Sequence, residues 1–160
     1  MTKIFEDEFM EWQADMVDIV DEYTEGRAEN IYLYGSIEDG GYFFNLFFKI
    51  KGKILFMHQV NSVLSEKDLK FDTSDYNQGK VLEVGVDDLQ KVADICKKYS
   101  KDIPTELKLF YDVKNNSLDA KYKYNPMYSD TYEIGPDDLF ISWYEQVKSA
   151  VENPQTFGFE

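Results

Sequence analysis

Two side chains of the sequence belong to types that often carry catalytic chemistry, and each type occurs once. His58 is the single histidine and Cys96 the single cysteine among the 160 residues. A serine–histidine–aspartate triad would have to use His58, and neither a histidine-rich nor a CxxC zinc site can be formed. His58 alternates with apolar residues in an expected strand, and Cys96 lies on the apolar side of an expected helix. Both are therefore predicted to be packing residues, and no catalytic residue, metal ligand or cofactor is expected.

Carboxylates are the abundant ionisable groups: 31 acidic side chains stand against 17 basic ones, for a formal net charge of −14. Paired carboxylates could do acid–base chemistry, but among so many acids such pairs indicate nothing. The segment Asp72–Gly79 lacks the alternating oxygen ligands and the sixth-position glycine of a calcium loop. Phosphate-binding glycine loops and nucleophile elbows do not occur in the sequence either. Because acidity repels nucleic acid, a protein-binding role is favoured over catalysis or nucleic-acid binding.

The negative charge is concentrated at the two ends of the chain. Residues 1–25 hold nine acids and one base, residues 125–160 hold seven acids and one base, and the middle is close to neutral. Apolar residues recur every three or four positions from about Lys3 to Tyr23, which predicts an amphipathic helix. Its polar side carries acids without lysines to pair with them: Asp7, Glu11, Asp18 and Glu22. This side is either a solvated surface that aids solubility or a docking surface for a basic partner.

Tyrosines and acids also gather in the loop from Asn125 to Gly135 and in the helix start that follows it. The partner-binding candidates of this region are Tyr128, Asp130, Tyr132, Glu133, Asp137 and Asp138. Tyrosine rings supply contact area at low entropic cost, and the carboxylates add charge. We expect these residues to be exposed and to contact the same partner as the acidic side of the first helix.

A sheet and three helices must position these residues. Strands separated by tight-turn signals are expected at Asn30–Ile37, Tyr42–Ile50 and Ile54–Val60, which predicts an antiparallel meander. Its second strand is apolar on both sides and is expected to be central and covered on both faces. A further hairpin is expected over residues 105–124. Two later helices are expected at Val86–Lys101 and Pro136–Val151.

Residues 61–84 have a weaker pattern, with a polar loop expected at Asp72–Gly79 and a short strand at Val81–Val84. The similar segments Glu83–Leu89 and Glu133–Leu139 are both interpreted as helix starts, since acids are favoured in a first turn. The fold class is therefore α+β: one domain over residues 1–152, with a flexible tail over 153–160. An acidic start without a basic n-region predicts no signal peptide and a cytoplasmic location. The longest apolar run, Tyr42–Ile50, is too short to span a bilayer, so no membrane association is expected.

The order of elements over roughly the first 125 residues follows a pattern seen in one protein family. Its parts are the acidic first helix, Ile31–Tyr34, the turn Asp39–Gly41, the aromatic strand Phe43–Phe48 and the hairpin from Thr105 to Tyr124. This pattern resembles the YezG family of antitoxins, which are immunity proteins against polymorphic toxins that Gram-positive bacteria export by type VII secretion. Several of those toxins are nucleases. The resemblance implies a role in bacterial competition, a cognate toxin as partner and no catalytic residues.

Charge and resemblance lead to the same expected function. The protein is expected to cover the active or substrate-binding surface of a basic nuclease toxin with acidic side chains, and to associate rapidly through electrostatic steering. Two alternatives remain open at this point. One is a small intracellular ligand-binding or enzyme domain with a pocket between the sheet and the last helix. The other is a DNA mimic that inhibits a DNA-binding protein. The oligomeric state is not indicated.

Overall fold

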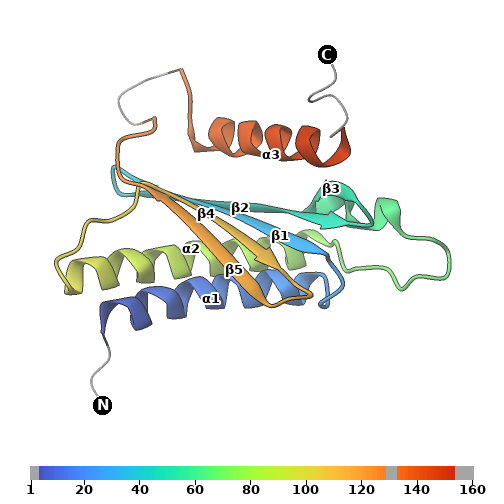
Figure 1. Ribbon diagram of the computed structural model, residues 1–160, viewed down its shortest axis with the longest axis horizontal. Helices are drawn as coiled ribbons and strands as arrows, with labels where there is room; N and C mark the ends of the chain where they lie inside the picture. Colours follow the sequence, from blue (N-terminus) through green and yellow to red (C-terminus); the bar gives the residue numbers. More distant parts are fainter. Residues whose placement is uncertain (1–3, 129–132, 154–160) are drawn as a thin grey trace.

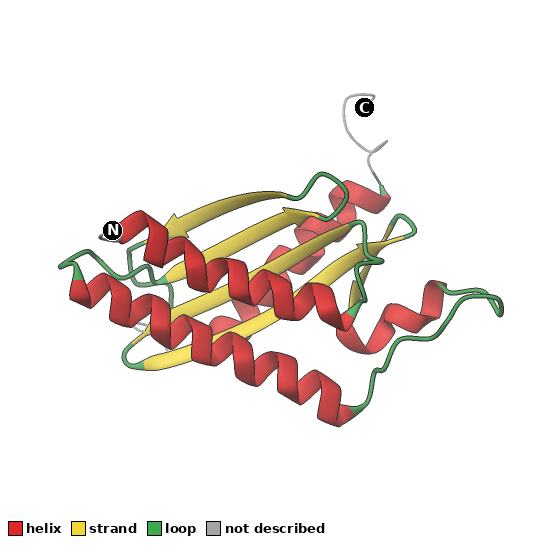
Figure 2. Cartoon of the chain, turned by 90° about the horizontal axis from the view of Figure 1, so that it is seen from below, coloured by secondary structure: helices red, strands yellow, loops and turns green. Residues whose placement is uncertain are grey.

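A computed structural model describes residues 4–128 and 133–153 of the chain. One antiparallel sheet has the strand order β3-β2-β1-β4-β5. Its strands are β1 (Asn30–Glu38), β2 (Gly41–Ile50), β3 (Lys53–Phe56), β4 (Glu106–Asp112) and β5 (Ser117–Lys123). Helices α1 (Phe5–Tyr23) and α2 (Asp75–Lys98) lie side by side on one face, and α3 (Pro136–Glu152) lies on the other (Figures 1 and 2). The predicted α+β fold is confirmed, and none of the described helices is long and apolar enough to cross a membrane.

Two tight turns set the register of the predicted meander. The turn residues Asp39-Gly40 and Lys51-Gly52 all have positive φ, between 50° and 77°. Two successive residues with positive φ form the type I′ turn, whose twist matches that of the flanking strands. β2 pairs with β1 from Gly41 to Lys49, but only its last four residues, Phe47–Ile50, pair with β3. The central strand is therefore β1, and β2 is interior rather than central.

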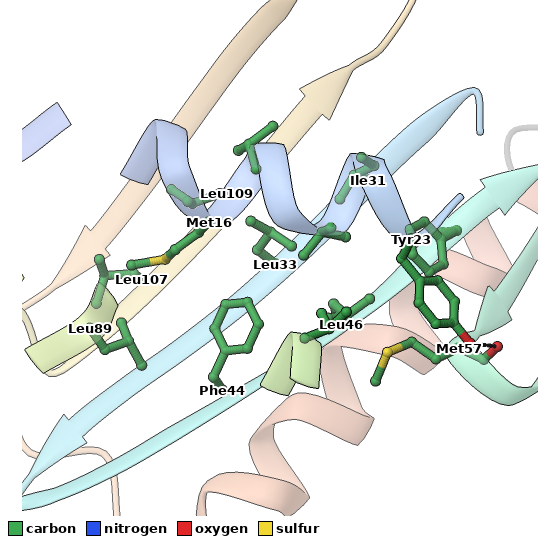
Figure 3. Packing of buried hydrophobic residues seen from close by; sticks show 14 of the residues in the cluster. Met16, Tyr23, Ile31, Leu33, Phe44, Leu46, Met57, Leu89, Leu107 and Leu109 are labelled. Carbon is green, nitrogen blue, oxygen red and sulfur yellow. Dashed lines mark hydrogen bonds between the residues drawn. The ribbon is translucent and has the colours of Figure 1, made fainter. Parts of the chain in front are cut away.

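The sheet buries apolar side chains on both faces. Leu33 and Leu46 pack against α1 and α2 in the larger core (Figure 3). On the opposite face Tyr34 and Phe47 pack against Phe140 of α3. Each such side chain contributes about 1.5–3 kcal/mol when it is removed from water. The two-sided burial predicted for β2 is confirmed.

β3 ends four residues before the predicted strand end at Val60. The Gln59 side chain accepts a hydrogen bond from the Phe56 N–H at 2.9 Å, and the Tyr23 hydroxyl donates to the Met57 carbonyl at 2.9 Å (Figure 3). The Tyr23 bond occupies the Met57 carbonyl, which a longer β3 would pair with β2, and the chain turns into a 3₁₀ helix, η1 (Met57–Val63). His58, predicted as a core or half-buried strand residue, is instead exposed and stacks on the Phe56 ring.

Helix α2 is the largest departure from the prediction. It begins at Asp75 and ends at Lys98, so it includes the second part of the predicted polar loop, from Asp75 to Gly79, and the predicted short strand Val81–Val84. The Ser74 hydroxyl caps it by accepting the Asn77 N–H at 3.2 Å. The segment Glu83–Leu89, interpreted as a helix start, lies in the middle of α2. Of the two similar segments, only Glu133–Leu139 contains a helix start.

Gly85 lies where α2 crosses β2. A Cβ atom there would lie 2.1 Å from the Phe44 ring, and Phe44 is only 4% exposed. We expect Gly85→Ala to lower the free energy of unfolding by about 2 kcal/mol, because overpacking exceeds the gain of about 1 kcal/mol in helix propensity. Denaturant titration measures this change. Gly79→Ala is the control, since nothing lies within 4 Å of its Cβ, and it should stabilise the protein. A Gly85→Ala variant as stable as the parent would contradict the packing described here.

Candidate functional site

Helix α1 carries the acidic surface that the sequence predicts. Eight of its 19 residues are acidic and none is basic. Phe9, Met16 and Val20 are buried at helical spacing, so the acids occupy the remaining faces. Acids in the first turn suit the positive end of the helix dipole, but Asp21 and Glu22 lie at the negative end, where carboxylates are unfavourable. Local helix stability therefore does not account for the acidity of α1.

Part of this acidity is used inside the molecule, where α1 meets α2. Glu8 forms an ion pair with Lys98 at 3.0 Å and accepts a hydrogen bond from the Tyr99 hydroxyl. The carboxyl groups of Asp15 and Asp88 are hydrogen-bonded, and Asp88 is only 1% exposed. Burial first, and then the hydrogen bond and charge of Asp15, raise the pKa of Asp88 to about 8. These contacts join the two helices.

The remaining predicted acids of α1 are all exposed: Asp7, Glu11, Asp18 and Glu22. Asp7, Asp18 and Glu22 form no ion pair with any other residue that the structure describes. The charge of Asp18 also acts on Asp21, whose pKa is raised first by burial and then by that charge. α1 thus presents a line of like charges that is not neutralised from within.

The C-terminal candidates lie at the start of α3. The structure describes Tyr128, Glu133, Asp137 and Asp138, whereas Asp130 and Tyr132 lie outside the described residues. Glu133, Asp137 and Asp138 are exposed. The Asp138 carboxylate accepts the Gly135 N–H at 2.9 Å, so this acid already caps the helix.

Tyr128 is half-buried, which differs from the exposed position expected from the sequence. Its hydroxyl oxygen accepts a hydrogen bond from the Ser36 hydroxyl at 2.9 Å. The backbone N–H groups of Met127 and Tyr128 donate to the Glu38 carboxylate at 2.9 and 3.4 Å. Burial raises the pKa of Tyr128, and the hydrogen bond from Ser36 opposes that shift. Tyr128 therefore anchors its segment to β1.

The structure does not bring the two predicted groups of acids onto one face. α1 lies on the face of the sheet that α2 shares, and Asp137 and Asp138 begin the helix on the opposite face (Figure 1). A partner that covers the outer side of α1 is separated from the start of α3 by the thickness of the sheet. The α1 acids therefore form the candidate partner-binding surface.

Two open hollows beside α3 have linings that the sequence analysis does not predict. One of about 350 Å³ lies between α3 and strands β1, β4 and β5, and its lining residues are Tyr32, Lys108, Phe110, Asp119, Lys121, Trp143 and Gln146. Lys108 Nζ lies 3.7 Å from Glu106 and 5.4 Å from the Trp143 ring centroid. A second hollow, of about 420 Å³, adjoins the edge of β2. Apolar and polar residues alternate over residues 118–124, which predicts that one face of this strand contacts solvent. The hollow beside the strand could not be predicted in the same way, because it depends on where α3 packs.

The single cysteine and histidine are placed apart from any cluster of ligands. Cys96 is fully buried, as predicted, and burial raises the pKa of its thiol. Within residues 4–128 and 133–153, no three histidine, cysteine, aspartate or glutamate side chains gather into a group that could hold a metal ion.

Comparison with known proteins adds no relative. No protein-family model matches the chain, and no curated protein matches it.

Proposed function

We propose that the protein is an immunity protein that binds and neutralises a toxin domain, as its resemblance to the YezG antitoxins implies. The observation that supports this most is the exposed acidic side of α1. Asp7, Asp18 and Glu22 are exposed and lack ion pairs among the described residues, on a helix without a single base. Like charges on a helix are destabilising, and a basic partner would remove that repulsion.

The proposed partner is a basic nuclease domain of a toxin exported by type VII secretion. A nuclease needs cationic side chains where it holds the phosphate backbone. From Asp7 to Glu22 the helix presents carboxylates over about 22 Å, at a rise of about 1.5 Å per residue. Binding of this line of charges would exclude nucleic acid from the cationic surface and would steer the encounter. The mechanism requires no catalytic group in the immunity protein.

Co-expression tests the proposal. The nuclease domain of the proposed cognate toxin is expressed from an inducible promoter, with or without this protein. Restored growth is the expected result, and an unrelated protein of similar size and net charge should not restore it. No rescue, with the protein present in folded form, would contradict the proposed function.

A second candidate function is the binding of a small molecule in the hollow between α3 and the sheet. The hollow combines the rings of Tyr32, Phe110 and Trp143 with the ammonium groups of Lys108 and Lys121. Rings and cations together suit an aromatic anion. Titration of Trp143 fluorescence, with Trp143→Phe as the background control, tests it with a panel of aromatic carboxylates. No binding at about 1 mM would exclude this candidate.

A further inference from the structure

The edge of the sheet beside β3 is incomplete. β3 has four residues and β2 has ten, so only Phe47–Ile50 of β2 are paired on that side. Over Gly41–Leu46, β2 has no strand partner on that side among the residues that the structure describes. Unpaired strand edges are templates for another extended chain.

The turn geometry shows which backbone groups face this open edge. The residue pairs that flank a two-residue hairpin turn are hydrogen-bonded, and the direction of bonding alternates along a strand. Gly41 flanks the first turn and pairs with β1, so the odd-numbered residues of β2 bond to β1. The even-numbered residues Tyr42, Phe44 and Leu46 therefore direct N–H and C=O groups toward the open edge. The Asn45 side chain supports this direction, since it accepts the Leu46 N–H at 2.8 Å in the absence of a strand.

A hollow of about 420 Å³ lies along the same edge. Phe43 and Asn45 of β2 line it, together with Leu82 of α2 on one side and Phe140 and Ile141 of α3 on the other. Ile141 is 39% exposed, so part of this apolar lining faces solvent. An extended segment laid along β2 would continue the sheet between the two helical layers and would place side chains in the hollow.

The charges at this site indicate the kind of segment that fits. The described lining residues include one acid, Asp137, and no lysine or arginine. The chain as a whole has a formal net charge of −14, which disfavours a second copy of itself as the occupant. A basic segment would complement the negative charge of the protein. Apolar residues at alternate positions of that segment would all lie on one face of the added strand, because side chains alternate along a strand.

We propose that the open edge of β2, from Tyr42 to Leu46, binds a basic, extended segment of a partner protein by strand addition. Backbone hydrogen bonds to Tyr42 and Phe44 would hold the segment, and apolar side chains would enter the hollow beside Phe140. The identification of that partner with the toxin domain rests on the proposed function. The edge site itself rests on the strand pairing and the hollow.

A synthetic peptide tests the edge site without any toxin. The probe is an acetylated, amidated heptapeptide that alternates lysine with valine and has a central phenylalanine. In ¹H–¹⁵N spectra of the full chain we expect shifts concentrated at residues 42–46 and 57–58. Peptide N-methylated on one edge should bind at least about fivefold more weakly, because it lacks the donors.

Tyr42→Pro removes one outward-facing N–H group without a loss from the β1–β2 ladder, as proline is tolerated on such edges. We expect it to weaken peptide binding at least about fivefold, whereas Tyr42→Ala, which also removes the ring, should stay within about twofold. Circular dichroism checks that both variants fold. If Tyr42→Pro does not fold, the N-methylated peptide decides the result on the parent protein.

Other outcomes overturn the edge site. One is the absence of shifts at residues 42–46 with about 2 mM peptide. A second is binding of the N-methylated peptide as tight as that of the unmethylated peptide. A third is a dimer of this chain that Tyr42→Pro abolishes. Growth rescue separates the two proposals. Rescue without peptide binding removes only the edge site, and peptide binding without rescue removes only the immunity function.

Discussion

Replacing Asp88 with asparagine is expected to raise the free energy of unfolding by about 2–4 kcal/mol near pH 8, with little change near pH 4. Asp88 is 1% exposed, and its pKa of about 8 is set by burial and by Asp15. In the folded protein near pH 5 its proton supplies the donor for the hydrogen bond to Asp15. In the Asp88→Asn variant the side-chain amide would supply that donor at every pH.

The direction in which stability changes with pH follows from the pKa of Asp88 in the folded and in the unfolded protein. In the unfolded chain an aspartate has a pKa of about 3.9, so between about pH 4 and 8 the folded state binds more protons than the unfolded state. Stability should therefore fall as the pH rises through this range, and the Asp88→Asn variant should lose most of that slope. The charged groups that face Asp88 are Asp15 of α1 and Asp87 and Lys91 of α2, and only Lys91 favours its ionised form.

Denaturant titrations across this pH range measure the effect. Asp87→Asn is the matched control, because Asp87 is the exposed neighbour on the same helix and its substitution should leave most of the slope in place. Equal slopes in the parent and in Asp88→Asn would show that Asp88 is not the group responsible.

Reversal of three α1 charges, Asp7→Lys, Asp18→Lys and Glu22→Lys together, is expected to slow association with the toxin domain by about 10–100-fold at low ionic strength. These three acids are exposed and form no ion pair with other described residues, so the fold should tolerate the change. The difference should shrink as salt screens the exposed charges. Stopped-flow or surface-based binding kinetics at two salt concentrations measure it.

A control variant separates local from overall charge. Glu66→Lys, Asp119→Lys and Glu145→Lys change the net charge equally, at exposed positions outside α1. Its association rate should fall by no more than about threefold. Equal slowing by both triple variants would mean that overall charge matters and that the α1 surface is not the contact.

The hairpins and the two-sided strand could be predicted because their signals are local. Asp39-Gly40 and Lys51-Gly52 suit the positive φ of their turns, and the alternation of Phe44 and Leu46 with Phe43 and Phe47 marks two buried faces. The start of α2 could not be predicted in the same way. Asn77 and Gly79 are typical of loops, and the helix there depends on the Ser74 cap and on packing of Val81 and Gly85 against the sheet.

In the candidate site too, the features set by local sequence could be predicted and those set by distant packing could not. The periodicity of α1 places Asp7, Asp18 and Glu22 on the polar side of the helix, and the structure shows them exposed. Periodicity cannot show that Asp15 meets Asp88 in a distant helix, or that Tyr128 is held by Ser36, since those contacts depend on how distant segments pack. The open edge of β2 depends on the early end of β3, where the Tyr23 hydroxyl holds the Met57 carbonyl that a longer strand would pair with β2.

Inhibition of the toxin domain by the purified protein tests the proposed neutralisation most directly. The nuclease domain of the proposed cognate toxin is assayed on DNA or RNA while this protein is added in increasing amounts. We predict that cleavage falls to background near one molar equivalent, and that the α1 triple variant requires about tenfold more protein. Full cleavage at about tenfold excess of the folded parent protein would contradict the proposal.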